Sequence, residues 1–421
     1  MRKLIWLLAL TGLLVFSFTP VGVRAQATTL KILSLNTDWC GTLQRLTPEF
    51  EKENNCKVVI DYVDYVNLYA KEMVELASAT GSYDLMAVCV EWVPTYAASS
   101  FTEPLEPWIT KYQMDTSGIV PSVLKAHQWK GKQYGMPVQA DSRMFFYQKA
   151  LFGEAGVTGI PQTWDQFFEA AKKIQSSGNI YGSSSDGQRG PYIVLSWAPF
   201  FFAAGGVPFI DNKPQFASEP AIQAAELYAK IIKELSPPGA INWGHSENIV
   251  AMQQNKIASC FSVTIDAPQV IPTVNGPKWA FGLYPLQNAS VKRVYTAVLG
   301  GWDLSMVSAS AKKDLAAKFI AWAIQKKNAL EMAKDGASPC QTYVFDELPT
   351  IKPEFKEYLN AWHETLDGAT PIYPYPNAGA FEEGLGEALS RIASGSGTAK
   401  AVLTDFNDKI AGTLKQMGYA Q

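Results

Sequence analysis

The first hundred residues alternate between apolar runs of strand length and segments with a helical period. The strand-like runs are residues 30–35, 58–63 and 84–90. Between them, apolar residues recur every three or four positions, as at Leu43, Leu46 and Phe50. This alternation predicts an α/β fold with a parallel sheet, whose strands are connected by right-handed helical crossovers.

Polar and aromatic side chains follow the first and third of these predicted strands. Asn36, Thr37, Asp38 and Trp39 come after the first strand, and Glu91 and Trp92 come directly after the third. In open parallel sheets, ligands bind beyond the carboxyl ends of the strands, so this rule points to all six residues. The acid–aromatic pairs Asp38–Trp39 and Glu91–Trp92 are the candidates for a ligand site among them, although loops at strand ends are also ordinary solvent-exposed turns.

Residues 129–174 combine a hairpin, a strand and a capped helix. Gly131 suits a tight turn, and the apolar positions that follow it alternate as in a strand. Thr163 and Gln166 have the spacing of a capping box, and Phe167 begins an apolar helical face. By itself, this pattern indicates only a globular α/β protein.

The second half of the chain also alternates between helical and strand-like patterns. Helices are predicted at 221–235, 315–322 and 402–414, and strands at 281–285 and 294–299. Ser218 is expected to cap the first of these helices. The Ser- and Gly-rich segment 176–190 is expected to be a surface insertion.

Residues 1–25 have the features of a secretory signal. Arg2 and Lys3 precede an apolar run that ends at Phe18, and small residues lead to a cleavage site after Ala25. We expect removal rather than a retained anchor, because the run is shorter than the ~20 residues that span a bilayer. No cysteine follows the cleavage site directly, which argues against a lipid attachment.

Length and composition restrict the remaining possibilities. A mature chain of about 395 residues is too long for one ordinary core and predicts two lobes. The formal net charge of −3 argues against a nucleic-acid partner, which would call for a basic surface. The three histidines are far apart and no CxxC motif occurs, so we expect no metal and no cofactor.

The cysteines leave two hypotheses open. They are Cys40, Cys56, Cys89, Cys260 and Cys340. In an oxidising compartment one or two disulfides are possible, with Cys260–Cys340 and Cys40–Cys89 as candidate pairs. Alternatively, the cysteines are small buried hydrophobic residues.

One set of motifs resembles a known family. The residues are Gly131-Lys132, Tyr134-Gly135, Pro137, Asp141, Tyr147-Gln148-Lys149, Leu151-Phe152 and Pro161-Gln162-Thr163-Trp164. They resemble the K-G-x-x-Y-G-x-P hairpin, the carboxylate, the Y-N-K-x-L-F strand end and the P-x-T-W-x-E-F helix start of the sugar-binding extracellular solute-binding proteins of ABC importers. Gln148 stands where Asn is usual, and Gln166 where Glu is usual.

The resemblance implies a periplasmic-binding-protein-like α/β fold, with two lobes, a hinge and a central ligand cleft. Lobe I would comprise residues 26–141 plus about 297–335, and lobe II residues 142–296 plus about 336–421. The chain would cross between the lobes near Asp141, Thr296 and Asp335. Several crossings restrict the motion to a hinge that closes the lobes over a ligand.

Sugar receptors combine aromatic faces, which cover the apolar side of a pyranose ring, with planar polar groups that bind hydroxyls. Trp302 and Asp303 form a third acid–aromatic pair of this kind. The resemblance implies that the ligand is faced by Glu91, by Asp141 and by Gly301 with Trp302. It implies the same, more loosely, for Asp266. Trp197 and Trp243 are further candidates from lobe II, and each could instead belong to the core. Arg143 would either reach the ligand or neutralise Asp141.

The resemblance implies a periplasmic, monomeric, non-catalytic receptor with a carbohydrate ligand and an ABC permease as its partners. Two alternatives remain open from the sequence. The same fold could bind a polyol, a glycerophosphodiester or another small solute. A secreted glycoside hydrolase would instead use Glu91 and Asp141 as its carboxylate pair, separated by ~5 to 9.5 Å.

Overall fold

A computed structural model of the chain describes residues 27–287, 290–292, 296–366 and 368–420. The predicted secretory signal and the first two residues of the strand expected at 294–299 lie outside these ranges. Within the described ranges, no helix combines the length and the apolar character needed to cross a membrane.

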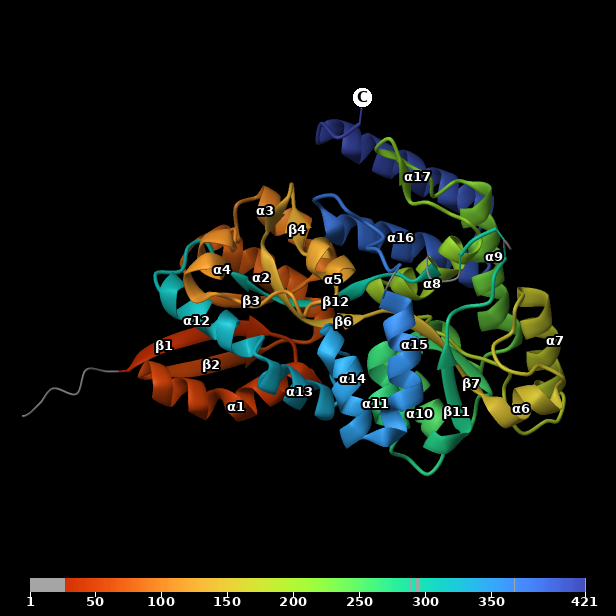
Figure 1. Cartoon of the computed structure of the whole chain (residues 1–421). Helices are drawn as coiled ribbons and strands as arrows, with labels where there is room; N and C mark the ends of the chain where they lie inside the picture. Colours follow the sequence, from red (N-terminus) through yellow and green to blue (C-terminus); the bar gives the residue numbers. More distant parts are fainter. Residues whose placement is uncertain (1–26, 288–289, 293–295, 367, 421) are drawn as a thin grey trace, which may run out of the picture.

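A five-stranded sheet organises the first body of the molecule (Figure 1). Its strands lie in the order β2 (Cys56–Tyr62), β1 (Thr28–Ser34), β3 (Leu85–Cys89), β12 (Gly300–Met306) and β6 (Gly135–Asp141). β1 runs parallel to β2 and β3, which confirms the predicted parallel core, and β12 runs antiparallel to β3 and β6. The crossover helix α1 (Asp38–Asn54) buries Leu43 and Phe50 on its apolar face, and α2 (Tyr65–Ser78) is the second crossover.

Shorter helices complete the first body. They are η1 (Val90–Trp92), α3 (Val93–Ala98), α4 (Glu106–Tyr112), α5 (Pro121–Ala126), α12 (Lys313–Ala323) and α13 (Lys326–Lys334). The predicted hairpin joins β4 (Gln128–Trp129) to β5 (Lys132–Gln133), and its turn residues Lys130 and Gly131 both have positive φ.

A three-stranded antiparallel sheet organises the second body. Its strands lie in the order β10 (Ser259–Val263), β7 (Arg143–Gln148) and β11 (Trp279–Gly282). The surrounding helices include α6 (Lys149–Glu154), α7 (Trp164–Gln175), α8 (Pro191–Ala203), α9 (Glu219–Glu234), α10 (His245–Gln253) and α11 (Ala267–Val270). Helix α7 begins as predicted, because the Thr163 hydroxyl accepts a hydrogen bond from the Gln166 backbone N–H at 3.2 Å.

Two sequence predictions are wrong in this part of the chain. The segment 176–190 is not a surface insertion, since Ser183 to Asp186 are fully buried and Ser185 pairs in parallel with Phe261. The strand expected at 294–299 instead begins at Gly300. Of the two hypotheses for the cysteines, the structure agrees with the second, because all five are free and buried. Ser218 precedes α9 as expected, but its side chain makes no capping hydrogen bond.

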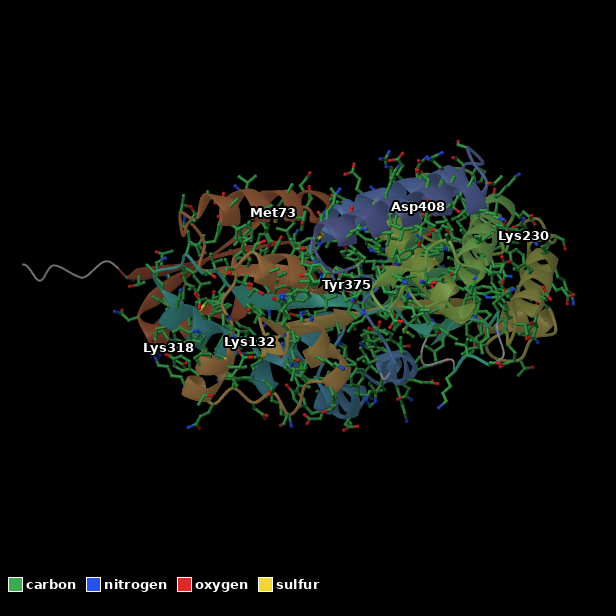
Figure 2. The ribbon with its side chains drawn as sticks, turned by 90° about the horizontal axis from the view of Figure 1, so that it is seen from above. Met73, Lys132, Lys230, Lys318, Tyr375 and Asp408 are labelled. Carbon is green, nitrogen blue, oxygen red and sulfur yellow. The ribbon has the colours of Figure 1, made fainter. Side chains whose placement is uncertain are left out.

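The chain passes directly from β6 to β7 at Ser142, and it returns to the first sheet between β11 and β12. Later, α13 packs on α1, whereas α15 (Lys356–Leu366) packs on β11. In the view from above, Met73 and Lys318 lie on one body, Lys230 and Asp408 on the other, and Tyr375 between them (Figure 2). The exact lobe boundaries given above remain a prediction.

The last helices belong mainly to the second body. They are α14 (Thr342–Ile351), α15, α16 (Ala378–Ala393) and α17 (Ala399–Gln416). Helix α16 packs on α8 and α9 along its length. Its beginning also touches the first body, where the backbone N–H groups of Asn377 and Ala378 donate to Thr95 Oγ1 at 3.0 and 3.3 Å. Helix α16 therefore spans the junction between the two bodies.

Candidate ligand-binding site

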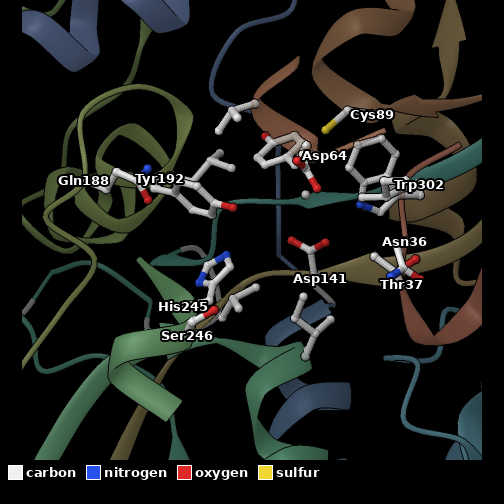
Figure 3. A pocket seen from close by; sticks show the side chains of 18 of the residues that line it. Asn36, Thr37, Asp64, Cys89, Asp141, Gln188, Tyr192, His245, Ser246 and Trp302 are labelled. Carbon is white, nitrogen blue, oxygen red and sulfur yellow. The ribbon is translucent and has the colours of Figure 1, made fainter. Parts of the chain in front are cut away.

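A cavity of about 520 Å³ lies between the two sheets, where β6 passes into β7. Figure 3 shows Tyr192 and His245 facing Trp302, Asn36 and Thr37 across Asp141, whose carboxyl group points into the space between them. The polar and aromatic lining residues are Asn36, Thr37, Asp64, Tyr65, Asp141, Arg143, Gln188, Tyr192, His245, Ser246 and Trp302. The cavity therefore takes side chains from both bodies and from the crossing between them.

The topology of the first sheet places four loops at this edge. Asn36 and Asp64 follow the carboxyl ends of the parallel strands β1 and β2, and Cys89 ends β3. Because β12 runs antiparallel to β3, its first residues, Gly300 to Trp302, lie at the same edge. The site thus follows the general rule for open α/β sheets.

Two glycines allow the backbone and the hinge carboxylate to come close together. Gly301 has φ +139, and a Cβ atom there would lie 2.5 Å from the Gln139 carbonyl oxygen. A Cβ atom at Gly300 would lie 2.3 Å from Asp141 Oδ1. Side chains at either position would force the backbone or Asp141 to move, so the Gly-Gly-Trp motif positions both the carboxylate and the indole.

An aromatic wall lines the first-body side of the cavity. The rings of Tyr65 and Trp302 meet edge to face, with centroids 5.6 Å apart. Trp92 supports both from behind, at 5.5 Å from Trp302 and 6.0 Å from Tyr65. Tyr65 also meets Tyr192 of the second body at 5.6 Å, so aromatic contact joins the two bodies beside the cavity.

Arg143 is the buried cation of the site. Its guanidinium lies 3.7 Å from Asp141 Oδ1 and 3.9 Å from Asp186 Oδ2, and its Nε donates to Ser196 Oγ at 3.3 Å. The side chain is only 3% exposed. Arg143 therefore lines the cavity and also supplies counter-charge to two carboxylates.

Asp186 anchors this charged cluster in the second body. Its carboxylate accepts from Ser196 Oγ at 3.0 Å and from Asn248 Nδ2 at 2.9 Å, and His245 Nδ1 lies 3.2 Å away. Burial alone would raise the pKa of Asp186, but His245 and Arg143 outweigh burial and hold the pKa below its usual value. Asp186 is thus a buried carboxylate whose negative charge is balanced by His245 and Arg143.

His245 brings a cation to the cavity wall. Burial would lower its pKa, but the nearby carboxylates of Asp186 and Asp266 raise it above the usual value. Asp266 lies behind the ring, with its Oδ2 3.9 Å from His245 Nδ1, and accepts a hydrogen bond from Ser262. Burial raises the pKa of Asp266 to about 7. Asp266 therefore acts on the cavity through His245.

Of the twelve residues selected from the sequence, four line the cavity. They are Asp141, Arg143, Gly301 and Trp302. Trp92 and Asp266 form a layer directly behind lining residues. Glu91 is buried, accepts a hydrogen bond from Cys89 Sγ at 2.8 Å, and is not among the lining residues.

The other five candidates lie elsewhere. Asp38 is exposed at the beginning of α1, and Trp39 is fully buried in the core. Trp197 is fully buried and stacks on Phe201 at 5.1 Å. Trp243 lines a separate outer groove, and Asp303 is buried and bonded to His127 Nδ1 at 2.7 Å.

Sequence reasoning missed several lining residues. Asp64 and Tyr65 follow the second predicted strand, so the rule applied to the first and third strands would have found them. Gln188 lies within the segment 176–190 that was expected to be an insertion, and Tyr192 lies at the start of α8 directly after it. Nothing in the local sequence signals these two residues or His245. Among the described residues, no group of three or more His, Cys, Asp or Glu side chains is arranged to hold a metal ion.

Comparison with known proteins agrees with this architecture. Residues 36–330 match the family described as bacterial extracellular solute-binding protein. A probable amino-acid ABC transporter periplasmic-binding protein of Sinorhizobium fredii is 24% identical, over 85% of this chain and 84% of the relative. The mannitol-binding protein of Pseudomonas aeruginosa is 24% identical, over 70% of this chain and 69% of the relative.

A solved structure shows the same fold. The solute-binding protein of Agrobacterium vitis S4 with bound D-mannitol superposes with a TM-score of 0.80, at 26% identity over 94% of this chain and 100% of that chain. The family match covers well over half of the sequence, from the loop after β1 into α13. The chain belongs to the bacterial extracellular solute-binding protein family.

Proposed function

We propose that this protein is the receptor of an ABC importer and binds an uncharged sugar or polyol in the cavity between its two bodies. One observation carries the proposal: the cavity combines an aromatic wall with carboxylate, guanidinium, imidazole and amide groups from both bodies. A polyhydroxylated solute needs both kinds of contact, because each buried hydroxyl left without a partner costs about 1–3 kcal/mol.

Each side of the cavity has a role in this proposal. Trp302 and Tyr65 offer apolar faces to the C–H side of the solute. Asp141 and Arg143 offer paired acceptors and donors for neighbouring hydroxyls. His245 and Gln188 would bind the solute from the second body. A solute that contacts both bodies selects the closed arrangement.

The relatives support the choice of ligand class. The Pseudomonas relative is named as a mannitol-binding protein, and the Agrobacterium structure holds D-mannitol. The cavity contains no cluster of several guanidinium groups, since Arg143 is the single Arg or Lys among its lining residues. That charge pattern favours an uncharged solute over a phosphate ester.

The remaining features of the proposal concern location and partners. The predicted signal at residues 1–25 would export the protein to the periplasm without a lipid anchor. Residues 26–141 with about 297–335, and 142–296 with about 336–421, would act as two lobes hinged at Ser142. The closed, monomeric receptor would then present both lobes to a membrane permease.

Glycoside hydrolysis is the weaker alternative. The carboxylate pair considered from the sequence was Glu91 with Asp141, and Glu91 does not line the cavity. Burial raises the pKa of Glu91 to about 7, but its neighbours are Cys89 and the core of the first body. A catalytic acid must reach the glycosidic oxygen, so this pKa alone does not support catalysis.

A ligand screen tests the proposal. The melting temperature of residues 26–421 would be measured with monosaccharides, disaccharides, polyols, amino acids and phosphate esters, and each hit would be analysed for breakdown products. We expect a saturable rise with a sugar or polyol that remains intact, because a ligand that binds the native state stabilises it. Stabilisation by amino acids or phosphate esters alone, or cleavage of the hit, would contradict the proposal.

A further inference from the structure

A second chamber, of about 510 Å³, lies on the other side of Tyr65 from the central cavity. The two spaces share Tyr65 and Val66 as a wall. The first body contributes α2 and Trp92 to the chamber, and the second body contributes residues 189–191 and the first turns of α16. Like the central cavity, the chamber is therefore built between the two bodies.

A buried carboxyl group without a charged partner faces this chamber. Glu382 lines the chamber and is 8% exposed. Its Oε1 has no hydrogen-bond partner in the described part of the chain, and the Trp92 indole is a neutral neighbour of the carboxyl group. Glu91, from the first body, is 1% exposed and also has an Oε1 atom without a partner. Buried carboxylates are usually paired, so an unpaired group here needs an explanation.

Among the residues that the structure describes, no Lys, Arg or His forms an ion pair with Glu382. Arg189 is the one basic residue among the chamber's lining residues, and its guanidinium is directed to Glu387, 3.5 Å away on the exposed surface. Glu383 adds a second acidic side chain to the lining. The chamber therefore has an excess of negative groups over positive ones.

Aromatic rings form the opposite wall. Trp92 lies 5.2 Å from Tyr69 and stacks with Tyr65 at 6.0 Å, and all three line the chamber. Aromatic faces attract organic cations through the ring quadrupole, and a carboxylate supplies the charged partner. Together these groups have the composition of a site for an ammonium ion.

The electrostatics of the two carboxyl groups agree with this composition. Burial and, to a smaller extent, the neighbouring Glu91 raise the pKa of Glu382 to about 8, although the Trp92 indole acts in the opposite direction. The other titratable groups that face Glu382 are Cys89 of β3 and Tyr65 and Tyr69 of α2. None of these groups supplies positive charge, so an ammonium ion would provide the missing partner.

We propose that this chamber binds a protonated amine, held by the Glu382 carboxylate against the rings of Trp92 and Tyr69. The amine is a small free amine, so the proposal is independent of the proposed sugar or polyol function. It contacts both bodies and stabilises the closed arrangement.

Titration calorimetry with residues 26–421 at pH 8.5 tests the proposal. The probe is putrescine, whose amino groups stay protonated at this pH, with 1,4-butanediol as its uncharged counterpart. We expect putrescine to bind at least tenfold more tightly than 1,4-butanediol.

Variants assign the binding to the chamber. Glu382→Gln should weaken amine binding at least tenfold, while the matched change Glu364→Gln on the exposed surface of α15 should leave it unchanged. Amine affinity should also rise with pH between 6 and 8, as Glu382 loses its proton, whereas the affinity for 1,4-butanediol should not.

Two results would overturn the proposal. One is the absence of amine binding at concentrations up to 10-fold above those at which the best neutral hit binds. The other is equal amine affinity in the wild type and Glu382→Gln. Retained folding of the variant would be checked by its melting temperature. If no sugar or polyol binds but putrescine does, the chamber stands and the proposed receptor function fails. If a sugar or polyol binds but putrescine does not, the proposed receptor function stands and the proposed amine site is wrong.

Discussion

The cluster around Arg143 and the pair formed by Glu91 and Glu382 are both sets of buried charged groups at the junction of the two bodies. In the first, Asp186 has an arginine, a histidine, a hydroxyl and an amide as partners. In the second, each carboxyl group has an oxygen without a partner. His245 Nδ1 and Asp266 Oδ1 in the first cluster also lack hydrogen-bond partners in the described part of the chain, so the difference lies in charge. The first cluster contains the cations Arg143 and His245, whereas the second pair has no cationic partner.

The pKa directions express this difference. Asp186 has a lowered pKa despite its burial, because counter-charge outweighs desolvation. Glu382 has a raised pKa, because burial and a like charge act together. We infer that the cluster around Arg143, which contains its own cations, is a rigid base for cavity residues. The Glu91–Glu382 pair has no cation of its own and is available to a ligand.

The largest effect is expected from Arg143→Met. This change removes the counter-charge of Asp186 and Asp141, and breaking a buried ion pair on one side costs about 3–5 kcal/mol of unfolding free energy. Urea unfolding at pH 7 would measure the loss. Arg189→Met is the matched control, because its pair with Glu387 is exposed on both sides and is worth about 0–1 kcal/mol. Equal losses of unfolding free energy in the two variants would contradict the claim that the buried ion pairs of Arg143 contribute more to stability than the exposed pair of Arg189.

Glu382→Gln is expected to stabilise the free protein at alkaline pH. The unfolded carboxyl group ionises near its usual pKa of 4.5 and the folded one at about 8, so the unfolded state loses its proton first. Stability therefore falls as pH rises from about 4.5 to 8, and the glutamine variant lacks this loss. We expect a gain of at least about 2 kcal/mol at pH 8.5 and little change at pH 4.5, from unfolding curves at both values. A variant less stable than the wild type at pH 8.5 would show that Glu382 has a hidden partner.

Trp302→Ala is expected to weaken binding of the solute found in the screen by at least tenfold, or about 1.4 kcal/mol. The reason is the loss of the aromatic wall while the charged cluster stays in place. Trp243→Ala is the control, since this indole lines a separate outer groove and should leave affinity unchanged. Calorimetry on both variants would measure the difference, and equal affinities would exclude Trp302 from the site.

Tyr192→Ala should have the smallest effect of the four. It removes the edge-to-face contact with Tyr65 that joins the bodies, a pair worth about 0.5–1.5 kcal/mol. We therefore expect affinity to fall by roughly two- to tenfold. Tyr181→Ala, at a partly exposed tyrosine outside the central cavity, is the control for loss of a ring. An unchanged affinity for Tyr192→Ala would mean that this contact does not contribute to closure.

Much of the fold was predictable because it depends on local periodicity. The parallel strands β1, β2 and β3 and the helices between them follow from apolar spacing alone. The segment 176–190 was not predictable in this way. Its polar residues suggested a surface loop, but Ser184 and Asp186 are buried because Asn248 and Ser196 satisfy them from distant elements.

The site was predictable only where a motif was continuous in sequence. Asp141 and Arg143 at the crossing, and Gly301 with Trp302 at the start of β12, line the cavity. The rule that acid–aromatic pairs follow strands does not tell which member of a pair faces the ligand. Trp39 turns into the core, because α1 begins at Asp38 and its first turn packs on the sheet. The second-body residues come together only through tertiary packing.

The most direct test of the central claim is the affinity of Asp141→Asn for the solute found in the screen, measured by calorimetry beside its melting temperature. Asp141 lies at the crossing between the bodies, and its carboxyl group points into the cavity (Figure 3). The account predicts at least a tenfold loss of affinity with a folded protein, because solute hydroxyls lose a charged acceptor. Wild-type affinity in this variant would contradict a solute site between the two bodies.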